Sequence, residues 1–202
     1  MGLYGKYVLP HLIDLSMKDR ATTKCRSEII PKARGRVLEI GIGSGLNFPY
    51  YGAGVTHVWG IDPSRELLAM ARPNRSAAPC SVELCCESAE QIPLNNASAD
   101  TIVLTWSLCT ISDPPRALEE MRRVLKPGGA VIFAEHGLAP DPGVRKWQER
   151  MSPLWKRLAG GCNMDRKIDQ LVTDAGFDIR ELRTSYLPGP RLLTYTYEGV
   201  AV

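Results

Sequence analysis

Residues 37–45 read Val-Leu-Glu-Ile-Gly-Ile-Gly-Ser-Gly, an apolar run that passes directly into three glycines at alternate positions. The run predicts a buried strand over 36–40. The glycines carry no Cβ, so the backbone can turn tightly and approach a ligand closely. The pattern predicts a helix directly after the loop, whose free N–H groups would face that ligand. This stretch therefore indicates a nucleotide-binding strand, loop and helix.

The spacing of the glycines favours one class of nucleotide. A dinucleotide-binding loop requires G-x-G-x-x-G, but Leu46 occupies the place of its third glycine. Asp62 ends the next apolar run, 17 residues after Gly45. A carboxylate there can accept hydrogen bonds from both hydroxyls of a ribose, although it could also cap a following helix. A nucleotide without phosphates fits both motifs better than a dinucleotide.

Short apolar runs alternate with helical patterns along most of the chain. The expected strands are 36–40, 57–61, 81–85, 101–106, 130–134, 177–183 and 192–199. The expected helices are 64–72, 114–125, 144–158 and 165–175, with two further helical patterns within 4–32. Asp113 is the expected N-cap of the helix over 114–125, and residues 126–129 are expected to stop it. The alternation indicates an α/β fold with a doubly wound, mostly parallel sheet.

Length and composition limit the class of protein. The chain has 202 residues, of which 44% are hydrophobic and 23% are charged, so we expect one globular domain. A net charge of +3 does not favour a nucleic-acid partner. We expect neither a transmembrane helix nor a secretory signal, and we expect a cytoplasmic location.

The cysteines carry no recognisable metal motif. They are Cys25, Cys80, Cys85, Cys86, Cys109 and Cys162, and none of them forms a C-x-x-C pair. The chain also has only three histidines. We interpret the cysteines as reduced thiols that pack as small apolar residues, and we expect no metal site.

With these motifs in this order, the chain resembles the class I S-adenosylmethionine-dependent methyltransferases, in the methyltransferase type 11 group. The resemblance covers about 34–177 and rests on the segments 37–45, 60–64, 89–94, 100–103 and 122–129. It implies a Rossmann-like sheet of seven strands, the last of them antiparallel. It also implies that S-adenosylmethionine lies across the carboxyl ends of the strands, with S-adenosylhomocysteine as the product.

The same resemblance implies roles for individual residues. Glu39, Gly41 and Gly43 would surround the methionine end of the cofactor, and Asp62 would bind the ribose hydroxyls. The other cofactor-binding residues that it implies are Asn47, Pro63, Ser88, Ala89, Glu90, Trp106 and Ser107. Many relatives carry an acidic residue at the position of Ser88, so the contact with the adenine amine departs from the family pattern here.

A narrower resemblance concerns the methyl acceptor. The segments 47–48, 108–111, 135–136, 155–156, 160–162 and 187–190 resemble a branch that contains alkyl-thiol methyltransferases. This branch also lies near bacterial phosphatidylethanolamine and quinone methyltransferases. We therefore expect methyl transfer to a small apolar molecule, with a thiol favoured. The alternatives are a lipid or quinone methyltransferase at a membrane surface and a non-catalytic cofactor-binding protein.

His136 is the candidate catalytic residue. It follows the fifth expected strand, at the end where α/β sheets bind ligands. Its imidazole would accept the proton of an acceptor thiol near neutral pH; alternatively it only orients Glu135 or caps a loop. Glu135 would pair with His136, neutralise the sulfonium or form a salt bridge. Cys109 is interpreted as a packing residue, because displacement at a sulfonium needs no covalent intermediate.

Two segments are expected to enclose the acceptor. Residues 1–34 would form a helical lid segment, 35–136 the cofactor-binding core, and 137–202 a substrate-cover helix followed by C-terminal strands. The apolar face of the cover helix would consist of Trp147, Met151, Leu154, Trp155 and Leu158. Tyr4, Tyr7 and Asn47 would complete the pocket. The alternatives for the first segment are a helix packed on the sheet and a peripheral contact with a membrane.

Overall fold

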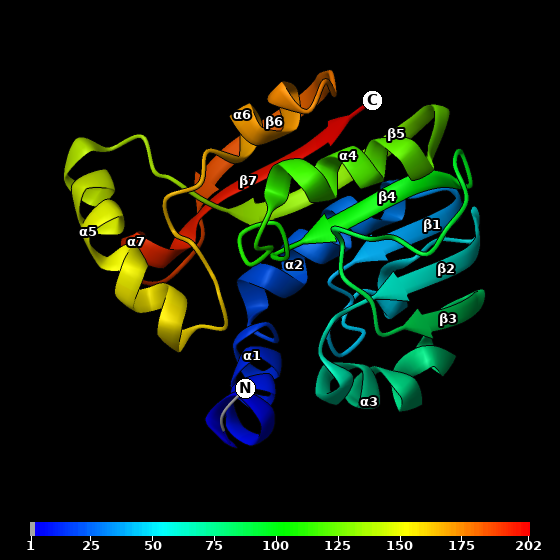
Figure 1. Ribbon diagram of the computed structural model, residues 1–202, viewed down its shortest axis with the longest axis horizontal. Coiled ribbons are helices and arrows are strands. Elements are labelled where there is room, and N and C mark those ends of the chain that lie inside the picture. Colours follow the sequence, from blue (N-terminus) through cyan, green and yellow to red (C-terminus); the bar gives the residue numbers. More distant parts are fainter. Residues whose placement is uncertain (1–2) are drawn as a thin grey trace.

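The computed structural model describes residues 3–202, and its seven strands form one sheet (Figure 1). The strands are β1 (Gly35–Ile40), β2 (Val55–Ile61), β3 (Ser81–Cys85), β4 (Ala99–Thr105), β5 (Leu125–His136), β6 (Ile179–Tyr186) and β7 (Tyr195–Ala201). Their order is β3-β2-β1-β4-β5-β7-β6. Strands β1 to β5 are parallel, and β7 runs antiparallel to β5 and β6. The expected seven-stranded, mostly parallel sheet is confirmed.

The helices lie on the faces of the sheet and beyond its carboxyl edge. The α-helices are α1 (Leu9–Ser16), α2 (Arg20–Ile29), α3 (Arg65–Asn74), α4 (Pro114–Val124), α5 (Pro142–Leu158), α6 (Ile168–Asp174) and α7 (Arg191–Thr194). The short π-helical segment η1 spans Tyr4–Val8, and the single 3-10 turns are η2 (Ile30–Lys32), η3 (Phe48–Tyr50) and η4 (Arg75–Ala77). In Figure 1, α4 crosses one face of the sheet, whereas α1 and α5 lie beyond the carboxyl ends of the parallel strands.

Both faces of the central strands are buried. Successive side chains along a strand point to opposite faces, so an apolar strand feeds two cores. One core contains the α4 and strand residues Leu38, Ile102, Phe133, Leu118 and Met121. The other contains Val37, Val103, Ile132 and, from the end of α2, Ile29 and Ile30. This two-sided burial explains why the central strands are apolar throughout their length.

The strand register brings the carboxyl ends of the strands to one edge. Ile40 of β1 pairs with Ile61 of β2 and with Leu104 of β4. Leu104 in turn pairs with Phe133 of β5. The residues at and just after the ends of these strands therefore lie at the same edge, and they include Gly41, Asp62, Trp106 and His136.

The helix expected directly after the glycines does not form, and that prediction is wrong. Within residues 46–54 the chain makes only the turn η3 before it enters β2. Pro49 has no N–H to donate to a helix. The ring of Phe48 packs directly against Gly45. A Cβ placed at Gly45 would lie only 2.3 Å from the Cε2 atom of Phe48. The loop is held instead by backbone hydrogen bonds, such as that from the N–H of Gly41 to the carbonyl of Ile61, and by the side chain of Asp62.

Several other boundaries differ from expectation. Residues 126–129 follow the end of α4 at Val124, as expected, but β5 begins at Leu125 rather than at 130 and includes them, because Leu125 already pairs with Ala99 of β4. Helix α6 begins at Ile168 rather than at 165, and residues 192–194 belong to α7 rather than to a strand. The expected N-cap of α4 is confirmed: the Asp113 carboxylate accepts a hydrogen bond from the N–H of Arg116 at 3.2 Å.

Candidate functional site

The loop after β1, residues 41–45, is shaped by its glycines. Gly41, Gly43 and Gly45 have φ angles of +67°, +57° and +81°, in the left-handed region that glycine adopts without strain. A Cβ at Gly41 would lie 2.5 Å from the Cβ of Ser107. The glycine loop therefore lies directly against the loop that follows β4, and only glycine permits this approach at position 41.

Asp62 joins the glycine loop to the end of β2. Its Oδ2 accepts a hydrogen bond from the N–H of Gly43 at 2.9 Å, and its Oδ1 accepts one from the N–H of Ser64 at 2.8 Å. The cap of α3 is Ser64, which accepts from the N–H of Leu67. Burial raises the pKa of Asp62, although the two hydrogen bonds act in the opposite direction. Each carboxylate oxygen keeps a lone pair, so Asp62 can also accept from the hydroxyls of a ribose.

Glu39 is 1% exposed at the end of β1. Its carboxylate accepts hydrogen bonds from the side-chain amide of Asn47 at 2.8 Å and from the hydroxyl of Tyr51 at 2.6 Å. Burial raises the pKa of Glu39 to about 7, although both bonds lower it. The Oδ1 of Asn47 is buried and has no hydrogen-bond partner among residues 3–202. A buried carboxylate and a free acceptor suit a cationic donor, such as the ammonium group of a methionine.

Ser88 and Glu90 follow β3, on the side where the resemblance expects the adenine. The hydroxyl of Ser88 donates to the carboxylate of Glu90, whose Oε1 accepts from the N–H of Asp113 at 3.2 Å. An acidic side chain thus lies beside Ser88, although the sequence has none at that position. The side chain of Ala89 is 6% exposed and packs in the core, whereas Pro63 is exposed. Only the backbone of Ala89 is left to contact a ligand.

Trp106 leaves β4 in a left-handed conformation with a φ angle of +52°. This conformation is uncommon for a residue other than glycine, and such residues cluster at functional sites. The N–H of Trp106 donates to the carbonyl of Ala134 at 2.8 Å. The guanidinium of Arg26 lies 4.8 Å from the centre of the indole ring. The turn at Trp106 directs the following residue, Ser107, toward the glycine loop.

Glu135 holds the loop that follows β4. Its carboxylate accepts hydrogen bonds from the N–H groups of Ser107 at 2.8 Å, Leu108 at 2.9 Å and Cys109 at 3.3 Å. Burial raises the pKa of Glu135 to about 6, and the three bonds oppose that rise. The expected roles of Glu135 concerned His136, the sulfonium or a salt bridge. The structure instead assigns its oxygens to the backbone of residues 107–109.

His136 lies beside two cysteine thiols at the end of β5. Its Nε2 is 3.4 Å from the Sγ of Cys162, and that sulfur is 3.7 Å from the Sγ of Cys109. Cys109 comes from the loop after β4, and Cys162 from the connection between α5 and α6. His136 is 7% exposed and Cys109 is 2% exposed. Sequence reasoning selected His136 and assigned Cys109 to packing. It missed Cys162, although the segment 160–162 carries part of the narrower resemblance.

The electrostatics of this group favour ionisation of one thiol. The hydrogen bond between Cys162 and Cys109, together with the nearby imidazole, holds the pKa of Cys162 well below its usual range. The bond to Cys162 and burial raise the pKa of Cys109. Burial acts to lower the pKa of His136, but its hydrogen bond to Cys162 and the charge of that residue outweigh burial and raise it. The surroundings therefore favour the thiolate form of Cys162 beside the imidazole of His136.

The N-terminal segment contacts both the glycine loop and α5. Asp14 of α1 accepts a hydrogen bond from the hydroxyl of Ser44 at 2.6 Å. The hydroxyl of Tyr4 donates to the carbonyl of Leu158, at the end of α5, at 3.0 Å. Helix α5 is itself fixed by the buried Gln148, which bonds to backbone groups of the loop after β5. Both segments thus lie at the carboxyl edge of the sheet.

The apolar face expected on α5 is only partly turned inward. Met151 and Trp155 are half-buried. Trp147, Leu154 and Leu158 are 56%, 52% and 53% exposed. The expectation of one covered apolar face, in the core or at an acceptor pocket, is therefore wrong for these three residues, because they are exposed.

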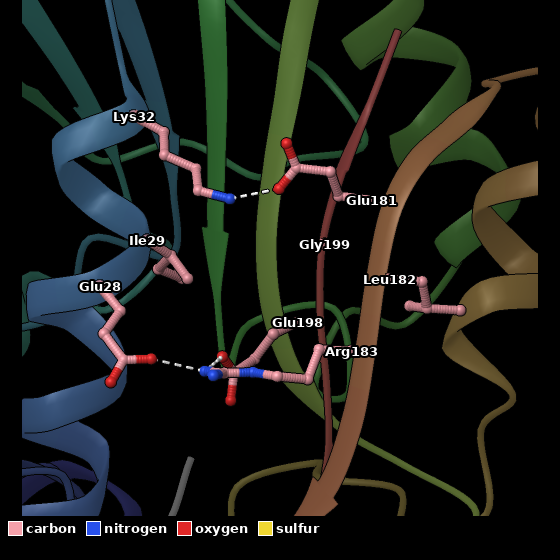
Figure 2. Close-up of a pocket in the computed structure, with 8 residues that line it drawn as sticks. All are labelled: Glu28, Ile29, Lys32, Glu181, Leu182, Arg183, Glu198 and Gly199. Carbon is pink, nitrogen blue, oxygen red and sulfur yellow. Dashed lines mark hydrogen bonds and ion pairs between the residues drawn. The ribbon is translucent and has the colours of Figure 1, made fainter.

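A cavity of about 480 Å³ lies elsewhere, between α2 and the strands β6 and β7 (Figure 2). Its charged side chains pair with one another: Lys32 with Glu181, and Arg183 with both Glu28 and Glu198. The residues selected by the sequence motifs lie outside this cavity. The candidate site is therefore the carboxyl edge of β1, β2, β4 and β5.

Comparison with known proteins agrees with this geometry. Residues 38–133 match the methyltransferase domain family. Over 160 residues the chain is 31% identical to thiol S-methyltransferase TMT1B of Rattus norvegicus, which covers 76% of this chain and 64% of that protein. It is 32% identical over 158 residues to a phosphatidylethanolamine N-methyltransferase of Cereibacter sphaeroides, covering 77% of this chain and 75% of that protein. A solved S-adenosylmethionine-dependent methyltransferase of Methanosarcina mazei has the same fold, with a TM-score of 0.64 and 21% identity over 82% of this chain and 91% of that one.

The family match includes the glycine loop, Asp62 and the strands that position them. The chain spans less than two thirds of the length of the thiol methyltransferase, at 64%. It spans 75% of the phosphatidylethanolamine methyltransferase. Sequence, strand order and the glycine-loop geometry agree, and the chain belongs to the class I S-adenosylmethionine-dependent methyltransferases.

Proposed function

We propose that this methyltransferase transfers a methyl group from S-adenosylmethionine to the sulfur of a small, apolar thiol. The observation that carries the proposal is the group formed by Cys109, His136 and Cys162, because it combines a basic nitrogen with sulfur at the edge where the family binds its cofactor. The likeness to a thiol S-methyltransferase supports the same acceptor.

The residues that would hold the cofactor lie close together at this edge of the sheet. The glycine loop offers backbone that approaches a ligand closely, Asp62 offers acceptors for ribose hydroxyls, and Glu39 offers a buried negative charge. When bound, S-adenosylmethionine would supply a methyl group on a positively charged sulfur, which a lone pair on the acceptor can take in line as S-adenosylhomocysteine leaves. The chain has to provide orientation, exclusion of water and removal of the acceptor's proton.

We assign to His136 the removal of the proton from the acceptor thiol. A free thiol has a pKa of about 8.5, so most of it is protonated at neutral pH and is a poor nucleophile. The imidazole of His136 is 7% exposed and already lies against sulfur, at 3.4 Å from Cys162. In our proposal an acceptor thiol enters beside this group, passes its proton to His136 and attacks as the thiolate.

The N-terminal segment and α5 would exclude water from the reacting atoms. The bond between Asp14 and Ser44 ties α1 to the glycine loop, and the bond between Tyr4 and Leu158 ties it to α5. Removing water strengthens the interaction between a thiolate and a sulfonium, because the local dielectric constant falls. These segments are therefore assigned the roles of lid and substrate cover.

The proposal is tested by measuring S-adenosylhomocysteine release with a panel of alkyl thiols, amines and phenols. We expect release with thiols, and we expect His136→Gln to lower it at least about 100-fold while S-adenosylmethionine binding persists. The matched control is His57→Gln, because His57 hydrogen-bonds Ser81 between β2 and β3, away from this edge. Release with amines or phenols alone would overturn the thiol assignment. Tight cofactor binding without release on any acceptor would support a non-catalytic binding protein.

A second candidate, methyl transfer to a lipid or quinone, is favoured by exposed apolar side chains at the same edge. Tyr7, Val8, Leu12 and Leu15 of the N-terminal segment are 59%, 45%, 49% and 70% exposed. They lie on the segment that contacts the exposed end of α5 through Tyr4. Within residues 3–202, the helices lack the length and apolar character needed to cross a bilayer. An apolar surface of this kind suits insertion into the membrane interface instead.

Vesicle experiments separate the two candidates. A lipid methyltransferase should co-sediment with phosphatidylethanolamine vesicles and release S-adenosylhomocysteine only in their presence. Leu15→Glu should then abolish sedimentation, whereas Leu182→Glu, which changes an exposed leucine on β6, should not. Release with soluble thiols and no sedimentation would remove this candidate.

A further inference from the structure

Two of the separations within the group formed by Cys109, His136 and Cys162 match those of a tetrahedral metal site. Zinc–sulfur bonds of about 2.3 Å and zinc–nitrogen bonds of about 2.0–2.1 Å place two tetrahedral sulfur ligands about 3.8 Å apart and a sulfur and a nitrogen about 3.6 Å apart. The observed separations are 3.7 Å between the two Sγ atoms and 3.4 Å between the Sγ of Cys162 and the Nε2 of His136. All three ligand atoms lie within 4.8 Å of one another.

We propose that Cys109, His136 and Cys162 bind a thiophilic divalent cation with the preferences of Zn²⁺. Two thiolates and one imidazole are a common ligand set for zinc, and hard cations such as Mg²⁺ are excluded by the sulfur ligands. Each cysteine gives up its thiol proton to solvent when the cation binds. Among residues 3–202 this group supplies three ligands, so one position of a tetrahedral ion is left for an external molecule.

Hydrogen bonds hold the three ligands in place before any ion arrives. The backbone N–H and the side-chain amide of Asn163 both donate to the carbonyl of Cys109, each at 2.9 Å. These bonds join the segment that carries Cys162 to the loop that carries Cys109. Glu135 binds the N–H of Cys109 from the opposite side. Such outer contacts reduce the cost of organising a metal site, because they fix the directions of the ligands.

The surroundings also suit the charge of two thiolates. The guanidinium of Arg166 bonds to the carbonyls of Leu108 and Ile111, which places a fixed cation beside the cysteines. The indole nitrogen of Trp155 is buried without a hydrogen-bond partner in the described chain, and this side chain lies close enough to Cys162 to act on its thiol. A thiolate that binds a metal can accept a weak N–H bond of this kind. We therefore assign Trp155 the role of donating a weak hydrogen bond to the thiolate of Cys162.

The open position has a consequence for catalysis, and this step rests on the proposed function. An acceptor thiol that binds the cation loses its proton to solvent and is held as a thiolate. That sulfur then forms the new S–CH₃ bond as the sulfonium–CH₃ bond breaks, and S-adenosylhomocysteine leaves. In the metal-loaded protein His136 is a ligand, and the cation replaces it in removing the proton. A soft cation at this place selects thiols over amines and phenols.

Cobalt provides a direct test, because Co²⁺ occupies tetrahedral zinc sites and absorbs visible light. The purified protein would be reduced, made anaerobic and titrated with Co²⁺. We expect one equivalent to bind, with the thiolate-to-cobalt charge-transfer band and the strong visible bands of a tetrahedral site, and we expect Zn²⁺ to abolish them. Cys109→Ser, Cys162→Ser and His136→Gln should each weaken binding by more than the roughly 10- to 100-fold lost on changing outer contacts.

Control variants distinguish loss of metal binding from loss of folding. Cys80→Ser changes a partly buried cysteine outside the group, so it should leave the cobalt spectrum unchanged. Binding of S-adenosylmethionine shows whether each variant is folded. A spectrum without charge-transfer bands, or bands that persist in folded Cys162→Ser, would overturn the metal site.

Activity assays separate this inference from the proposed function. Cobalt bands without methylation of any thiol would leave the metal site standing and overturn the thiol reaction. Thiol methylation that survives complete metal removal would confine the site to a role outside catalysis and would overturn the step at the open position.

Discussion

The side-chain amide of Asn47 donates a hydrogen bond to the carboxylate of Glu39 at 2.8 Å, where Glu39 is 1% exposed. This bond fixes the carboxylate at the end of β1, immediately before the glycine loop. Burial raises the pKa of Glu39 to about 7. The charge of this residue therefore changes near physiological pH, which gives cofactor binding a measurable pH dependence.

We expect the affinity for S-adenosylmethionine to increase as the pH rises through about 7. Below that pH, Glu39 is protonated and offers no charge to the ammonium group of the cofactor, whereas above it the carboxylate is ionised. An attraction of roughly 1.4 kcal/mol corresponds to a change of about tenfold in Kd. Calorimetric titration at several pH values measures this change. Glu39→Gln should bind S-adenosylmethionine weakly, with a Kd that does not change with pH. Glu149→Gln, which changes an exposed residue on α5, should keep the pH dependence of the wild type. A slope that persists in Glu39→Gln would contradict the assignment.

Gly41→Ala should disrupt the cofactor site. A Cβ at position 41 would lie 2.5 Å from the Cβ of Ser107, and the φ angle of +67° is unfavourable for alanine. We expect a loss of about 3 kcal/mol in the free energy of unfolding and at least tenfold weaker cofactor binding. The matched control is Gly128→Ala, which has a φ angle of +77° but meets no atom within 4 Å. It should cost only about 1 kcal/mol. Equal losses in both variants would show that backbone strain, not contact with Ser107, decides the effect.

Glu120→Gln should destabilise the protein at neutral pH. Glu120 is 7% exposed, bonds to Arg123 through both oxygens and accepts from the N–H of Ile92 at 3.0 Å. We expect a loss of roughly 2 kcal/mol in the free energy of unfolding, because a hydrogen-bonded ion pair is broken and Arg123 loses its charged partner. Urea denaturation measures it. Glu119→Gln, on an exposed pair with Arg116, should change the value by less than about 0.5 kcal/mol.

The ion pair between Glu120 and Arg123 also predicts how the free energy of unfolding depends on pH. The Arg123 guanidinium lowers the pKa of Glu120 to about 2 in the folded protein, below its ordinary value of 4.5. The unfolded chain therefore takes up the proton first as the pH falls. The contribution of Glu120 is complete above about 4.5 and is lost between that pH and about 2. The difference between wild type and Glu120→Gln should accordingly shrink over this range. A constant difference would show that charge is not the cause.

Asp14→Ala should release the N-terminal segment from the glycine loop. The bond from the Ser44 hydroxyl to Asp14 is 2.6 Å long, and its loss removes a direct tie between α1 and the cofactor site. We expect S-adenosylmethionine to dissociate about fivefold faster, which corresponds to about 1 kcal/mol. Stopped-flow measurement of tryptophan fluorescence follows the dissociation. Lys18→Gln is the control, because Lys18 pairs with Asp14 at 2.6 Å without this bond to Ser44. Unchanged dissociation in Asp14→Ala would remove the lid role.

Local patterns predicted most of the elements correctly. The third strand was expected at 81–85 and forms over Ser81–Cys85, and Asp113 caps α4 as its sequence context indicates. Predictions from local sequence patterns were wrong where contacts between distant residues decide the structure. No helix forms after the glycine loop, because the Phe48 ring occupies the space under Gly45 and Pro49 cannot donate. The apolar stripe on α5 is split between buried and exposed residues for a similar reason: the pattern does not say which neighbour covers it.

The sequence by itself determined the strands, the glycine loop and the position of Asp62, because these depend on residues close together in the chain. The tertiary structure alone decided how distant residues meet. Cys109 and Cys162 are 53 residues apart and His136 is 26 residues from Cys162, yet their ligand atoms converge at one edge of the sheet. That convergence depends on parallel strand register and on the hydrogen bonds of Asn163, which hold two separate loops together. The spacing of residues along the chain does not predict such contacts. The group of Cys109, His136 and Cys162 is therefore recognisable only in the folded protein.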